Sequence, residues 1–118
     1  MDLSEKKIDS ELKYSGVIVN VMLDHAELCD GSIVKREVVE HPGGVTVLPI
    51  DDDGFCYCVR QFRYPMGKVM LEAPAGKLEK GEDHRECAVR ELSEETGFSA
   101  DELTYLGPIC TCLLYTSD

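Results

Sequence analysis

The order of apolar and polar positions divides the chain into several short strands followed by one helical segment. Apolar or alternating runs bounded by turn residues predict strands at residues 15–24, 34–40, 45–50, 55–62 and 69–72. Between the first two, Cys29-Asp-Gly-Ser has the composition of a turn, and Asp51-Asp-Asp-Gly has that of a hairpin loop. Residues 103–110 are compatible with the start of one more strand.

A helix is expected at residues 83–96, with Gly97 as the glycine that ends it. A sheet beside a helix is an α/β layered arrangement. No repeat or linker divides the sequence, and 118 residues suffice for one domain with its own core.

Composition and charge narrow the classes of partner. The formal net charge of -11 argues against nucleic acid or an anionic membrane, whereas a phosphate-bearing small molecule is compatible if a metal ion inverts the local charge. No apolar run approaches membrane-spanning length. The six cysteines include no Cys-x-x-Cys spacing, which favours reduced thiols and a cytoplasmic location over a disulfide or metal framework.

Three glutamates share one side of the expected helix. At about 100° per residue, Glu95 lies about 40° from Glu91 around the helix axis, and Glu94 lies about 60° from Glu91 in the opposite direction. Such carboxylates repel one another unless a cation lies among them, and Mg²⁺ or Mn²⁺ prefers these oxygen ligands. Arg90, four residues before Glu94, can pair with it and orient it. The alternative is an exposed acidic stripe, and Glu82 suits either a metal or the positive end of the helix dipole.

A cluster of this kind suits hydrolysis of a pyrophosphate. Divalent ions between the glutamates and the phosphate oxygens would shield an attacking hydroxide from the anionic substrate and lower the pKa of a bound water. A general base must then accept the proton. Glutamates that bind the metal are poor bases, so we expect a separate carboxylate to serve.

The segment from Gly76 to Phe98 matches the pattern Gly-x5-Glu-x7-Arg-Glu-apolar-x-Glu-Glu-x-Gly-apolar at all nine specified positions. It resembles the signature of the Nudix hydrolases. The resemblance implies a Nudix-type mixed β-sheet sandwiched with helices, in a domain covering residues 1–111. Within the family, Val39-Glu-His-Pro-Gly, Arg60-Gln-Phe-Arg-Tyr-Pro and Leu71-Glu-Ala-Pro-Ala-Gly-Lys-Leu are most similar to ADP-ribose pyrophosphatases.

This resemblance implies Mg²⁺-dependent cleavage of ADP-ribose to AMP and ribose 5-phosphate. Two alternatives stay open: a pyrophosphatase for another nucleotide sugar, and a Nudix-type domain that binds a nucleotide without cleaving it. The resemblance also implies a homodimer, in which the N-terminal strands pack on the partner.

Site residues follow by position from the same resemblance. Metal contacts are expected from the Ala75 carbonyl, Glu91 and Glu95, with Glu94 adjacent; Glu94 and Arg90 form the expected catalytic group. Arg63 matches an arginine that contacts the substrate diphosphate, although a solvated cation at a strand end is the plain alternative. Glu72 matches a residue near the metal-bound substrate.

The C-terminal end departs from the family pattern. The expected general base lies on a loop beyond residue 118, and so does a C-terminal helix, so we expect the C-terminal part of the fold to be missing and turnover to be slow. Residues 112–118 resemble the translation of a transposase end sequence used in sequencing libraries. They are therefore either a non-native tail or a natural terminal strand.

Overall fold

The computed structural model describes residues 2–110, in which three antiparallel groups of strands accompany one α-helix. This confirms the expected α/β arrangement. The first sheet has the order β1 (Lys6–Ser15), β2 (Asn20–Glu27), β3 (Ile33–Glu40). The remaining elements are β4 (Gly44–Thr46) paired with β7 (Ala75–Lys77), β5 (Val59–Arg63) paired with β6 (Lys68–Glu72), the 3-10 turn η1 (Tyr64–Met66) and the helix α1 (His84–Thr96). The expected tail at 112–118 lies outside the described residues.

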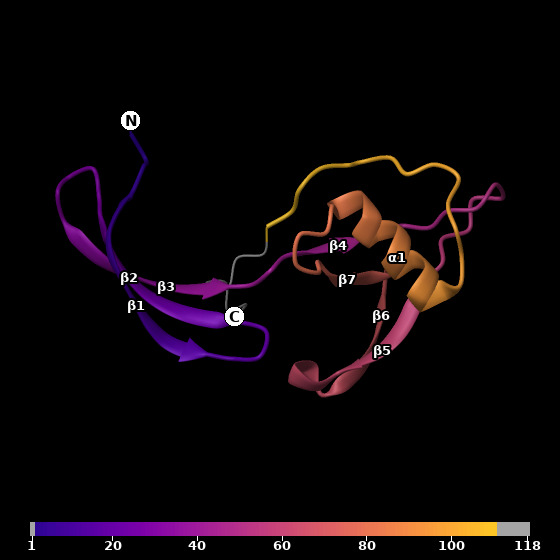
Figure 1. The fold of residues 1–118 in the computed structure, drawn as a ribbon, viewed down its shortest axis with the longest axis horizontal. Coiled ribbons are helices and arrows are strands. Elements are labelled where there is room, and N and C mark those ends of the chain that lie inside the picture. The colour runs from indigo at the N-terminus through magenta and orange to yellow at the C-terminus, as the bar shows by residue number, and fades with distance from the viewer. Residues whose placement is uncertain (1, 111–118) are drawn as a thin grey trace.

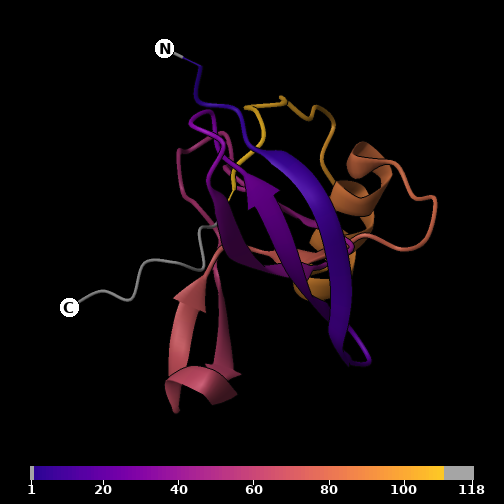
Figure 2. The same ribbon diagram turned by 90° about the vertical axis from the view of Figure 1, so that its left-hand side faces the viewer.

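The molecule is elongated. The sheet β1–β3 lies at one end, and α1 with β4 and β7 lies at the other (Figure 1). The principal extents are 56 × 34 × 33 Å and the radius of gyration is 18.5 Å. A compact chain of this length would have a radius of gyration of about 13 Å. The β5–β6 hairpin projects away from α1 (Figure 2), so the elements share little common core.

The prediction of a strand at residues 15–24 is wrong for the first half of this range. Gly16 N–H donates to the Val19 carbonyl at 2.8 Å, so 16–19 form the turn between β1 and β2. The strand β1 itself was missed, because all its residues are exposed and charged residues interrupt any apolar face. Its position is fixed by backbone pairing with β2 rather than by burial.

The strands expected at 45–50 and 55–62 are shorter in the structure. The strand β4 ends at Thr46, and β5 begins at Val59. Between them, one isolated bridge joins Ile50 to Cys56 around the 51–54 loop, which confirms the expected hairpin loop. Within this interval, Pro49 has no N–H to donate to a ladder, while its carbonyl accepts from Tyr57 N–H at 3.0 Å.

Residues 103–110 form no strand, contrary to expectation. Gly107 has a φ of +129° and is followed by Pro108, which has no backbone N–H. Both features are unfavourable for regular strand pairing.

The helix α1 confirms its predicted bounds to within a residue. Asp83 caps its start by accepting a hydrogen bond from Arg85 N–H at 2.9 Å, and Gly97, with a φ of +75°, ends it. The helix packs on β4 and β7, where Leu92 and Cys87 are buried. Burial raises the pKa of the Cys87 thiol to about 11.

In the structure Cys29, Cys56, Cys58 and Cys87 form no disulfide, and the reduced state of the thiols stays a prediction. No helix among residues 2–110 is long and apolar enough to cross a bilayer.

Candidate active site

The strand β7 brings the glycine of the sequence motif under the helix carboxylates. A Cβ atom on Gly76 would lie 1.9 Å from the carboxyl carbon of Glu91, so no other residue fits there without movement of the glutamate. Glu91 is buried at 9% exposure, against this bare backbone. Glycine is therefore required at position 76 because only a residue without a side chain lets the Glu91 carboxylate lie directly against the strand.

Glu95 lies one turn further along α1 and contacts the same strand. Its Oε2 accepts a hydrogen bond from Ala75 N–H at 3.0 Å. Ladder hydrogen bonds join Leu78 N to Gly43 O and Val47 N to Pro74 O. Because bonded and non-bonded pairs alternate in an antiparallel ladder, the pair Thr46–Ala75 is non-bonded, and the peptide groups of Ala75 face away from β4. The Ala75 carbonyl is thus on the same side as Glu95.

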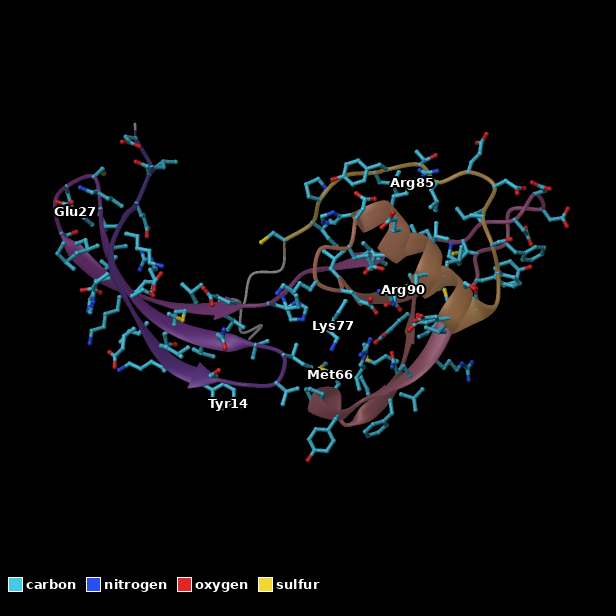
Figure 3. All side chains as sticks on the ribbon, viewed as in Figure 1. Tyr14, Glu27, Met66, Lys77, Arg85 and Arg90 are labelled. Atoms are coloured by element: carbon cyan, nitrogen blue, oxygen red, sulfur yellow. The ribbon has the colours of Figure 1, made fainter. Side chains whose placement is uncertain are left out.

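Arg90 links the helix to the loop before it. Its Nε and Nη2 donate to the two oxygens of Glu82 at 2.8 and 2.9 Å, and Nη1 donates to Glu91 Oε1 at 2.7 Å. Nη1 also donates to Glu94 Oε2 at 3.2 Å, which confirms the predicted pairing. Nη2 donates further to the carbonyl of Lys77, the last residue of β7, at 3.1 Å. Figure 3 labels both residues, Arg90 at α1 and Lys77 at β7.

The structure gives Glu82 a role besides its two sequence-based interpretations, which both stay predictions. Hydrogen bonds from Arg90, and then from the Glu79 N–H, lower the pKa of Glu82 to about 2. Both oxygens of Glu82 are engaged by Arg90. Glu82 therefore holds Arg90 in place, a role that the helix-dipole and metal interpretations did not include.

The three helix glutamates do not converge on one point. Glu91 faces Gly76 and Arg90, Glu95 faces Ala75, and Glu94 is turned to Arg90 with its side chain 59% exposed. Across residues 2–110, no three His, Cys, Asp or Glu side chains are arranged to hold a metal ion. Each carboxylate instead accepts a hydrogen bond from a nearby donor, and these bonds offset the repulsion between the carboxylates.

The donors nevertheless suit a hard cation. Glu91 uses only Oε1 for Arg90, and Glu95 uses only Oε2 for Ala75, so within the described part of the chain the second oxygen of each remains available. With the Ala75 carbonyl, these are oxygen ligands of the kind that Mg²⁺ or Mn²⁺ prefers. The metal assignment of Ala75, Glu91, Glu94 and Glu95 stays a prediction.

A groove of about 650 Å³ opens beside these residues, within the usual size of a small-molecule site. It is lined by residues from the β1–β2 turn, the segment between β3 and β4, β4, β5, β7 and α1: Ile18, His41, Gly44, Val45, Thr46, Gln61, Arg63, Ala75, Gly76, Lys77, Glu91 and Glu95. The contributions of His41, Gln61 and Lys77 were not predicted. For all three, the family-like segments that contain them were the available signal.

Arg63 and Glu72, both expected near the substrate, contact each other. Arg63 Nε donates to Glu72 Oε1 at 2.8 Å, and Nη2 donates to Oε2 at 2.6 Å. The pair lowers the pKa of Glu72 and raises that of Arg63 through these hydrogen bonds. Arg63 lines the groove, so the structure brings it to the same space as Glu91 and Glu95.

The fold and the groove define an α/β domain whose helix presents carboxylates over a glycine-containing strand. Residues 40–116 match the family model described as NUDIX domain. The chain belongs to the NUDIX domain family.

Curated relatives are similar over most of this chain. It is 47% identical to the ADP-ribose pyrophosphatase of Bacillus subtilis (strain 168) and 46% identical to the methanol dehydrogenase activator of Bacillus methanolicus, in each case over 86% of this chain and 55% of the relative. It is 42% identical to the ADP-ribose pyrophosphatase of Mycobacterium tuberculosis, over 79% of this chain and 45% of the relative. The chain therefore spans about half the length of these relatives.

A solved structure has the same fold. The crystal structure of an ADP compounds hydrolase superposes with a TM-score of 0.76 at 27% sequence identity, covering 91% of this chain and 59% of the other.

Proposed function

We propose that this chain carries the metal-binding and diphosphate-binding part of a hydrolase that cleaves the pyrophosphate of a nucleoside diphosphate sugar. ADP-ribose, split to AMP and ribose 5-phosphate, is the first candidate substrate. The main support is that Glu91 and Glu95 of α1 lie against the glycine-containing strand β7 and line the groove. The names of the relatives from Bacillus subtilis and Mycobacterium tuberculosis support the choice of ADP-ribose.

In this proposal, the Ala75 carbonyl, Glu91 and Glu95 hold the cation, with Glu94 adjacent. Bound Mg²⁺ would neutralise charge on the diphosphate and lower the pKa of a bound water. Arg90 fixes the direction of Glu91 through the 2.7 Å contact and contacts Glu94 at 3.2 Å. Arg63 and Lys77 supply positive charge along the groove for phosphate oxygens. We place the general base on a carboxylate beyond residue 118.

The proposal includes three further features. The cation is Mg²⁺, because its preference for oxygen ligands fits the donor set. The protein is a homodimer, because the strands of the sheet β1–β3 carry exposed apolar residues that a second copy would cover: Ile8, Leu12, Tyr14, Ile33, Val38 and Val39. Its location is cytoplasmic, in keeping with Cys29, Cys56, Cys58 and Cys87, which form no disulfide.

The test uses a chimera that continues residue 110 into the remaining length of the Bacillus subtilis relative, incubated with Mg²⁺ and ADP-ribose. We expect release of AMP, and we expect Glu95→Gln to abolish it while the circular dichroism spectrum stays unchanged. Release of AMP at the same rate from Glu95→Gln would remove the metal assignment.

The same chimera separates the two alternatives. Faster cleavage of a UDP-sugar or GDP-sugar than of ADP-ribose would favour another nucleotide-sugar pyrophosphatase. Tight binding of ADP-ribose without any product would favour a nucleotide-binding domain.

A further inference from the structure

Arg63 and Glu72 form an ion pair although they are not opposite each other in the hairpin. In the β5–β6 hairpin, Arg63 lies opposite Lys68 and Glu72 lies opposite Val59, at the other end of the ladder. The Arg63 side chain therefore runs back along the hairpin to reach Glu72. There it makes the two-point contact at 2.8 and 2.6 Å.

This contact occupies the part of Arg63 that an anionic ligand would need. A guanidinium fork matches a carboxylate and a phosphate with the same two-point geometry. Arg63 lines the groove together with the carboxylates of Glu91 and Glu95. The groove has two cationic side chains, Arg63 and Lys77, for two carboxylates, so an anionic ligand depends on these cations. Glu72 already engages one of them, Arg63.

We propose that Glu72 is an internal competitor for the anionic ligand of the groove, so that a diphosphate binds Arg63 only by displacing the Glu72 carboxylate. This inference rests on the proposed function, in taking the ligand to be a diphosphate. The exchange is feasible because the two side chains are partly exposed, at 44% for Arg63 and 22% for Glu72. A ligand with little negative charge cannot replace the carboxylate, so Glu72 favours polyanions.

The size of the effect follows from the exposure of the pair. Partly exposed ion pairs contribute modestly, so the competition should weaken anion binding by about three- to fivefold. Because the pairing lowers the pKa of Glu72, the competing carboxylate is fully charged at neutral pH.

The test measures binding of inorganic pyrophosphate to the 118-residue chain by calorimetry, without metal and at physiological salt. Glu72→Gln should bind about three- to fivefold more tightly than the unaltered chain. Arg63→Gln should bind more weakly, and Arg63→Gln/Glu72→Gln should gain nothing over Arg63→Gln. Glu37→Gln, an exposed carboxylate on β3, is the control for removal of one negative charge and should leave the affinity unchanged.

Two results would overturn the inference: equal affinities for Glu72→Gln and Glu37→Gln, or a gain from Glu72→Gln that persists without Arg63. If Glu72→Gln fails to fold, NMR on the unaltered chain decides instead. Saturating pyrophosphate should then shift both the Arg63 Nε–H signal and the Glu72 carboxyl signal, and an unmoved Glu72 signal would contradict the exchange.

Failure of this inference is distinguishable from failure of the proposed function. AMP release by the chimera with no effect of Glu72→Gln on pyrophosphate binding would remove the competition and leave the hydrolase. Tighter pyrophosphate binding by Glu72→Gln, with no AMP release, would keep the competition and remove the hydrolase.

Discussion

Different kinds of interaction stabilise the helix end of the molecule and the N-terminal sheet at its other end. At the helix end, Leu92 and Cys87 are buried under α1, and the Glu91 carboxylate lies against Gly76. In the sheet β1–β3, every residue of β1 is exposed, and the side-chain contacts are mainly surface pairs such as Arg36–Glu5, with Asp24 of β2 as a buried exception. The helix end therefore depends on close packing, whereas the N-terminal sheet depends on its backbone ladder.

This difference explains where the candidate site lies. Side chains that must keep one orientation are found where packing and hydrogen bonds fix them, as Arg90 does for Glu91. The N-terminal sheet has apolar residues without cover, including Leu12 and Tyr14. Such a surface can gain contacts from a partner, which is the basis for the proposed homodimer.

The largest expected difference between the two ends comes from truncating a leucine in each. Leu92 is 2% exposed, so Leu92→Ala should lower the free energy of unfolding by about 3 kcal/mol. Leu12 is 52% exposed, so Leu12→Ala should cost less than about 1 kcal/mol. Urea denaturation measures both, and similar costs would show that the N-terminal sheet has a core of its own.

The second effect concerns the glycine under Glu91. Gly76→Ala places a methyl group where the Glu91 carboxylate lies. Because that carboxylate is buried and bonded to Arg90, its displacement should destabilise the fold by about 2 kcal/mol. The double variant Gly76→Ala/Glu91→Ala removes the clash and should recover most of that loss in urea denaturation. If the single variant is as stable as the unaltered chain, Glu91 does not lie against the strand.

The third effect is a dependence of stability on pH. The pKa of Glu82 is lowered from its ordinary value of 4.5 to about 2, chiefly by hydrogen bonds from Arg90. The folded-state pKa lies below the unfolded one, so this contribution is complete above pH 4.5 and is lost as the pH falls towards 2. Glu82→Gln should flatten the fall in stability over that window, measured by denaturation at a series of pH values, whereas Glu37→Gln should not. A fall of unchanged steepness in Glu82→Gln would argue against the Arg90 contact.

The smallest effect is expected in the N-terminal sheet. Arg36 donates to both oxygens of Glu5 at 2.9 and 2.8 Å, but the pair is exposed. Arg36→Ala should leave the thermal midpoint unchanged within error, because exposed ion pairs contribute little. A clear drop would mean that ion pairs hold this sheet together.

Local features of this fold were predictable from sequence. The helix α1 is bounded by Asp83 and Gly97, whose effects act within a few residues, and the Arg90–Glu94 contact follows from helical spacing. The fully exposed β1 and the three-residue β7 were not predictable, because neither has a hydrophobic pattern. The pairing of β7 with β4 depends on contacts distant in sequence.

The sequence predicted several residues of the candidate site, but it did not predict most of the contacts between them. Helical angles correctly place Glu91 and Glu95 on one side, but the Arg90 and Ala75 donors decide where each carboxylate turns. The Arg63–Glu72 contact depends on the register of a hairpin, which sequence patterns do not supply. Groove residues such as His41 come from a separate segment and are brought in only by the fold.

The central claim is that Glu91 and Glu95 hold a divalent cation beside the groove. Calorimetric titration of Mn²⁺ into the 118-residue chain tests it directly, with Glu91→Gln, Glu95→Gln and the control Glu37→Gln measured in parallel. We expect weak but measurable uptake by the unaltered chain and by Glu37→Gln, and at least tenfold weaker uptake by Glu91→Gln and Glu95→Gln. Equal uptake by all four proteins, or none by any, would contradict the claim.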